Sequence, residues 1–141
     1  MGLSPYLLAA ASAWLVAQLC KYLLQAAKSK SLSDVSQMYQ SGNMPSSHSA
    51  MMAAVTTAIA LIDGLNSGLF ALSLVITVIV MYDAVQVRRA VGEQGVALRE
   101  ILEKVKIVKK LHHALGHKPL EVAVGAALGA VVAFFITHLS I

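Results

Sequence analysis

Residues 69–87 read LFALSLVITVIVMYDAVQV, an apolar run whose only charged side chain, Asp83, lies close to its end. A helix of this length rises about 28 Å, close to the roughly 30 Å thickness of the hydrocarbon core of a bilayer. The whole chain agrees with this reading, because 57% of its 141 residues are hydrophobic and only 13% are charged. Its mean hydropathy is +0.71, and soluble domains usually carry about 25% charged residues. The stretch therefore predicts a membrane-spanning helix in an integral membrane protein.

Three further apolar runs flank this stretch, at about 3–27, 45–62 and 119–139. We therefore predict an all-α integral membrane protein of about four transmembrane helices, folded as a single domain over residues 1–141. The second run is close to the shortest that can cross a bilayer. Pro45 suits its first helical turn, and three serines offer caps for it: Ser46, Ser47 and Ser49.

The fourth run carries small residues at helical spacing, Gly125, Ala126 and Gly129, which favour close packing of helices. Four spans make a thin wall around any binding site, which favours a homo-oligomer. We expect that this small-residue face could serve such an assembly.

Residues 93–112 have a different pattern, in which apolar side chains recur at helical spacing while most charges lie elsewhere on the helix. This pattern predicts an amphipathic helix on the membrane surface, ended by Gly116. A soluble helical hairpin is the alternative. The apolar positions are Val96, Leu98, Ile101, Leu102, Val105, Val108 and Leu111.

The positive charges are confined to two regions of the chain. Beside membrane spans, such clusters mark the cytoplasmic side more often than they contact nucleic acid, so we predict no nucleic-acid partner. Four spans place both regions on one side, and the positive-inside rule makes that side cytoplasmic, with both termini opposite. The residues are Lys21, Lys28 and Lys30 in the first region, and Arg88, Arg89, Arg99, Lys104, Lys106, Lys109, Lys110 and Lys118 in the second.

The same face carries two histidines at the starts of predicted helices, His48 at the start of the second span and His117 at the start of the fourth. Free N–H groups at helix starts bind anions, phosphate above all. One imidazole could attack phosphorus while the other protonates the leaving oxygen. Glu121 lies four residues after His117, so it can hold that ring in one tautomer.

These residues resemble the motifs of the phosphatidic acid phosphatase type 2 superfamily, which includes the vanadium haloperoxidases. Its pattern is K-x6-R-P, then P-S-G-H, then S-R-x5-H-x3-D. Residues 45–48, PSSH, match the second motif with serine for glycine, and residues 116–121, GHKPLE, resemble the third with glutamate for aspartate. Lys21 and Lys28 keep the spacing of the first motif, with Lys28 in place of arginine. The match is closest to the short, divergent membrane branch of the superfamily.

The resemblance implies a role for each matching residue. His117 is the nucleophile that forms a phosphohistidine, Glu121 orients it, and His48 protonates the leaving group. The arginine of the third motif is Arg88 or Arg89, separated from His117 by the amphipathic insertion rather than by five residues. No metal or other cofactor is implied. The residues expected to bind phosphate are Lys21, Lys28, Ser46, Ser47, Arg88 and Arg89.

The sequence thus predicts a metal-independent phosphatase acting on a lipid phosphate or a polyprenyl phosphate or diphosphate. A site at membrane level lets the lipid tail stay in the bilayer while the headgroup meets the cations. A degenerate member that binds lipid phosphate without turnover is the alternative. A small transporter or channel would need polar residues deep inside the spans, and this chain has almost none there.

Overall fold

The computed structural model describes residues 3–29, 44–107 and 116–140, without the side chains of residues 28, 29 and 140. Every regular element in these ranges is helical, as predicted. The helices are α1 (Pro5–Ser29), α2 (Ser47–Ile62), α3 (Gly68–Tyr82), the π-helical turn η2 (Asp83–Val87), α4 (Arg88–Lys104) and α5 (Pro119–Ser140).

Three of the helical segments are long and apolar enough to cross a membrane: Pro5–Ala27, Gly68–Lys104 and Pro119–Leu139. The fourth apolar helix, α2, has 16 residues and rises only about 24 Å. It packs against α1, α3 and α5, so its neighbours shield this short helix from lipid. The expected all-α membrane fold is confirmed, with an apolar helix α2 that is shorter than each of the three candidate membrane spans.

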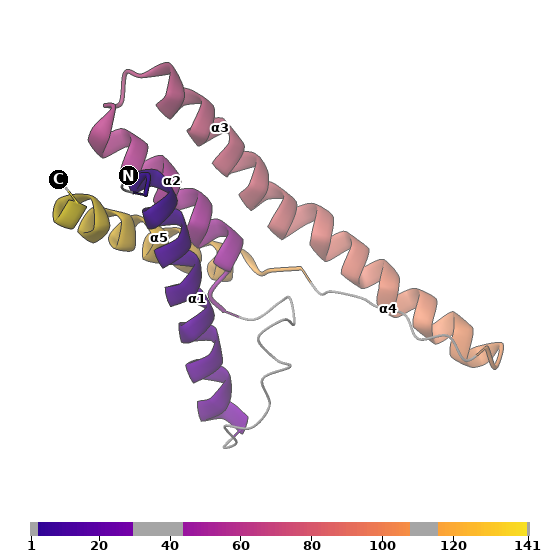
Figure 1. Ribbon diagram of the computed structural model, residues 1–141. Helices are drawn as coiled ribbons and strands as arrows, with labels where there is room; N and C mark the ends of the chain where they lie inside the picture. Colours follow the sequence, from indigo (N-terminus) through magenta and orange to yellow (C-terminus); the bar gives the residue numbers. More distant parts are fainter. Residues whose placement is uncertain (1–2, 30–43, 108–115, 141) are drawn as a thin grey trace.

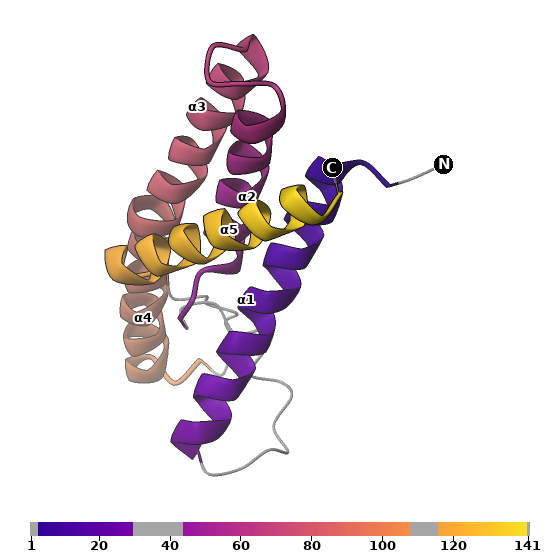
Figure 2. The ribbon, with the colours of Figure 1, turned by 90° about the vertical axis from the view of Figure 1, so that its left-hand side faces the viewer.

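Helices α1, α2 and α3 run in alternating directions (Figure 1). The start of α1 and the end of α5 lie close together in both views, and α5 crosses α1 at a clear inclination (Figure 1, Figure 2). The start of α5 and the turn η2 are in contact. The segments that carry the predicted site therefore meet where α2 and α5 begin and α3 ends.

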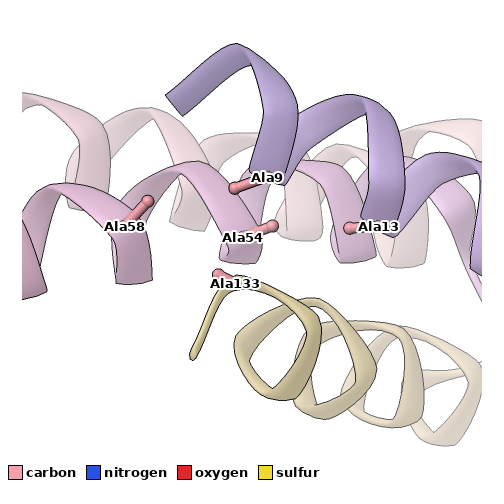
Figure 3. Close-up of a cluster of buried hydrophobic side chains, with 5 residues drawn as sticks. All are labelled: Ala9, Ala13, Ala54, Ala58 and Ala133. Atoms are coloured by element: carbon pink, nitrogen blue, oxygen red, sulfur yellow. The ribbon is translucent and has the colours of Figure 1, made fainter. Parts of the chain in front are cut away.

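The core of the bundle is built from small side chains. Figure 3 shows the alanines that meet where α1, α2 and α5 pack together: Ala9, Ala13, Ala54, Ala58 and Ala133. Large apolar side chains such as Leu7, Ile79 and Phe135 are instead exposed. Small residues inside and large apolar residues outside are typical of helices packed in lipid, where close backbone approach drives association.

The small-residue face of the fourth span packs against α2. A Cβ added to Gly125 would collide with the carbonyl oxygen of Ser46, and one added to Gly129 would collide with that of Ala50. Helix α2 therefore occupies this face within the chain. The expectation that the face serves a homo-oligomer is wrong for this reason, and the homo-oligomer itself stays a prediction.

Helices α2 and α3 are also joined by side-chain hydrogen bonds. The hydroxyls of Thr56 and Thr77 lie 2.8 Å apart, and Thr77 donates to the carbonyl oxygen of Met52 over 3.3 Å. Such interhelical hydrogen bonds satisfy buried polar groups where no water is available.

The amphipathic segment differs from its sequence-based description in its boundaries. Helix α4 continues α3 through η2 in nearly the same direction (Figure 1), because neither proline nor a turn sequence separates them. It ends at Lys104 rather than near Gly116, since Lys106 takes a left-handed backbone conformation (φ 56°) and Ile107 N–H donates to Leu102. Residues 108–112 lie outside the described ranges. The position of this segment on the membrane surface stays a prediction.

Candidate active site

The start of α5 holds His117 and Glu121 as a hydrogen-bonded pair. His117 Nδ1 lies 3.0 Å from Glu121 Oε2, and the two side chains are only 7% and 13% exposed. The same carboxylate oxygen accepts the N–H of Lys118 over 3.1 Å, as in a helix capping box. With Nδ1–H donated to a carboxylate, the lone pair of His117 lies on Nε2. The spacing-based prediction of this pair agrees with the geometry.

The backbone of His117 is anchored on the π-helical turn. Its N–H donates to the carbonyl oxygen of Ala84 over 3.1 Å. Gly116 lies directly against the Arg88–Arg89 peptide, and a Cβ there would be 2.8 Å from Arg88 C and closer still to Arg89. Only glycine fits this contact. The sequence predicts only that Gly116 ends a helix, and its position directly before His117 is the one signal for this contact.

The start of α2 is fastened to the same place. The N–H of Ser46 donates to the carbonyl oxygen of Glu121 over 3.1 Å, and Gly125 allows the two backbones to approach. Ser46 caps α2 by accepting from the N–H of Ser49. The helix therefore begins two residues later than expected, at Ser47, with Pro45 ahead of the cap rather than in the first turn.

His48 lies in the first turn of α2 and is exposed. Its ring is within electrostatic reach of Arg88, His117, Lys21 and Asp83. No hydrogen bond of the imidazole is present within the described part of the chain. The two histidines, far apart in sequence, are thus brought together with two cations.

Lys21 is buried in α1, with 5% of its surface exposed. Its ammonium is attracted by Glu121, yet across residues 3–29, 44–107 and 116–140 it forms no ion pair within 4 Å. A buried ammonium without a close counter-ion is costly, so an anion that enters this site would lower that cost. The side chain of Lys28, in the last turn of α1, lies outside the described residues.

The two neighbouring arginines, Arg88 and Arg89, have different surroundings. Arg88 Nε lies 2.6 Å from Asp83 Oδ2, and Arg88 interacts electrostatically with His48. Arg89 instead pairs with Glu93 one turn along α4, with both side chains well exposed. Arg88 is therefore within electrostatic reach of His48, whereas Arg89 is engaged by Glu93 on α4.

The two serines of the PSSH motif are both buried. The hydroxyl of Ser46 is 2.9 Å from that of Ser49 and is engaged in capping α2, because it is the last residue before the helix. Ser47 follows it in the first turn. Direct phosphate contacts by these hydroxyls stay a prediction.

The described residues contain no group of three or more His, Cys, Asp or Glu side chains placed to hold a metal ion. What gathers instead is a buried imidazole–carboxylate pair, a second imidazole and two cations. The set can therefore bind an anion, and it offers a nucleophilic nitrogen on one side and a proton donor on the other.

Comparison with known proteins agrees with the motifs. The family model described as "Divergent PAP2 family" matches residues 3–132. The chain is 37% identical over 149 aligned positions to the "Uncharacterized membrane protein YuiD" of Bacillus subtilis (strain 168), covering 94% of this chain and 93% of that protein. No solved structure matches it. The chain therefore belongs to the divergent PAP2 family and is an integral membrane protein.

Proposed function

We propose that this protein is a metal-independent phosphatase that hydrolyses a lipid or polyprenyl phosphate or diphosphate through a phosphohistidine. One observation carries the proposal: His48, the buried His117–Glu121 pair, Lys21 and Arg88 converge where α2 and α5 begin. Two imidazoles and two cations gathered at one place fit a phosphate that must be held, attacked and released.

In the first step, Nε2 of His117 attacks phosphorus, and the bond between phosphorus and the lipid oxygen breaks. The Nδ1–H of His117 stays hydrogen-bonded to Glu121, which stabilises the positive charge that develops on the ring. Protonated His48 gives its proton to the departing oxygen, so the lipid leaves as a neutral alcohol or, from a diphosphate, as a monophosphate.

In the second step, water attacks the phosphohistidine while His48, now neutral, takes the proton from that water. The N–P bond breaks, inorganic phosphate is formed, and both histidines return to their starting states. Lys21 and Arg88 balance the charge of the phosphoryl oxygens in both steps. Lys28, Ser46 and Ser47 are further phosphate contacts in this proposal.

The membrane supplies the reason for a lipid substrate. Large apolar side chains cover α1, α3 and α5, so a lipid tail can remain in the bilayer beside the helices while its headgroup reaches the cations. The positive-inside pattern of Lys and Arg supports a cytoplasmic site, with both termini on the other side.

The test is an assay of phosphate release by the purified protein, in buffer that contains a metal chelator. The substrates are phosphatidic acid, a polyprenyl phosphate and a polyprenyl diphosphate. We expect activity in the wild type and none in His117→Ala or His48→Ala, while His138→Ala, at the far end of α5, behaves like wild type. A wild type no faster than His117→Ala on every substrate would overturn the proposal.

The alternative, a lipid-phosphate-binding protein without turnover, is favoured by the departures from the family motifs, glutamate at 121 and lysine at 28. It predicts headgroup binding that survives His117→Ala and weakens in Arg88→Ala. Binding to liposomes with and without phosphatidic acid, measured beside phosphate release, separates the two functions: a wild type that binds the headgroup and releases no phosphate supports this alternative.

A further inference from the structure

The π-helical turn η2 contains an ion pair that the proposed reaction does not yet use. Arg88 N–H donates to the carbonyl oxygen of Asp83 in the turn, and Arg88 Nε lies 2.6 Å from Asp83 Oδ2. In a regular α-helix, side chains five residues apart point about 140° away from each other. The wider π-helical turn brings these two side chains together, and π-helical turns often occur at functional sites.

Among the residues that the structure describes, the pair leaves the two Nη atoms of the guanidinium without a hydrogen bond. Asp83 takes only Nε, and no hydrogen bond of Nη1 or Nη2 is present in the described part of the chain. These two nitrogens form the fork that binds phosphate oxygens in a bidentate manner. The guanidinium is therefore fixed on one side, and its fork remains available for a ligand near His48.

The same five-residue turn also fixes the position of the nucleophile. The carbonyl oxygen of Ala84, the residue after Asp83, accepts the N–H of His117, and Gly116 packs on the Arg88–Arg89 peptide. Arg88 and His117 are far apart along the chain, and η2 holds both.

We propose that Asp83 is a positioning residue: within the π-helical turn it holds Arg88 so that the guanidinium fork faces a phosphate bound between His48 and His117. The proposal rests on the proposed function and makes Arg88, rather than Arg89, the arginine of the site. The ion pair is roughly half exposed, and pairs of this kind contribute little to folding stability, so a purely stabilising role is a weaker explanation.

If the Asp83 carboxylate is removed, a positioning role and a simple charge effect predict opposite changes in phosphate binding. Asp83 is an anion near the site, so its loss makes the site more positive, and charge alone would tighten phosphate binding. Loss of positioning frees the Arg88 side chain and weakens binding. We expect Asp83→Ala to raise both KM for phosphatidic acid and the inhibition constant of orthovanadate about tenfold, as for loss of a charge-assisted hydrogen bond, with a smaller change in kcat.

A double-mutant cycle completes the test. If Asp83 acts through Arg88, then Asp83→Ala has no further effect in an Arg88→Ala background. Glu93→Ala is the matched control, because it breaks the exposed Arg89–Glu93 pair on the same helix and should leave both constants unchanged. Asp83→Asn, which keeps the size and one acceptor oxygen, should give a smaller change in the same direction if Asp83→Ala does not fold.

Three results would overturn the inference: constants for Asp83→Ala equal to those of Glu93→Ala, tighter vanadate binding, or a full additional loss on top of Arg88→Ala. Each requires a wild type that is active or binds vanadate. A wild type that neither releases phosphate nor binds vanadate overturns the proposed function itself, which is a different outcome.

Discussion

Gly116→Ala tests the contact that joins the two distant halves of the site. The added Cβ would lie 2.5 Å from Arg89 Cα and 2.8 Å from Arg88 C, whereas carbon atoms pack best at about 3.5–4.0 Å. The segment before α5 must therefore move away from η2 by about 1 Å. Overpacking of this kind costs about 1–3 kcal/mol of stability, and a shift of 1 Å in a reacting group lowers the rate about a hundredfold.

The assay is kcat for phosphate release from phosphatidic acid, measured beside the thermal unfolding of the protein in detergent. Gly68→Ala is the matched control, because a Cβ added at the start of α3 meets nothing within 4 Å and should leave both quantities unchanged. A Gly116→Ala protein with the rate of the wild type would refute the argument that this contact positions His117.

The remaining predictions concern the buried pair, the buried cation, the helix contact and the orientation. Glu121→Gln keeps the shape but removes the charge that holds the His117 tautomer, so kcat should fall roughly 10²–10⁴-fold; an unchanged kcat would exclude that role. Lys21→Met should raise the unfolding temperature, because a buried charge is removed, while KM rises; a lower unfolding temperature would contradict the burial argument. Gly129→Leu should destabilise the protein by about 1–3 kcal/mol, since its side chain would meet the Ala50 carbonyl; wild-type melting would disprove this packing. A reporter fused to the C-terminus should appear outside the cytoplasm, and a cytoplasmic signal would contradict the positive-inside orientation.

The membrane helices could be predicted because their signal is local. A long apolar run with one charge needs no knowledge of the rest of the chain to be recognised. The His117–Glu121 pair is local too, since residues four apart share a helix face. Convergence of His48 with His117 followed from placing two helix starts on one membrane face, which is a consequence of alternating spans.

The arrangement around η2 could not be predicted, because it depends on helix rotation and long-range contacts. Arg88 and Arg89 point about 100° apart on a helix, so which of them lies near His48 depends on how the helix is rotated after the π-helical turn. Nothing in the composition of residues 83–88 signals that turn. Likewise, the small residues of α5 predicted a close contact, but only the structure identifies α2 as the partner.

The most direct measurement is the capture of the covalent intermediate. The protein is mixed with phosphatidic acid that carries a label in its phosphate, and the reaction is quenched rapidly in alkali, which preserves phosphohistidine. The peptides of the protein are then analysed by mass spectrometry. We expect a phosphoryl group on the peptide containing His117. It should accumulate in His48→Ala if leaving-group release still proceeds, and it should be absent in His117→Ala. An active wild type with label on another residue, or with no labelled intermediate under any quench time, would contradict this expectation.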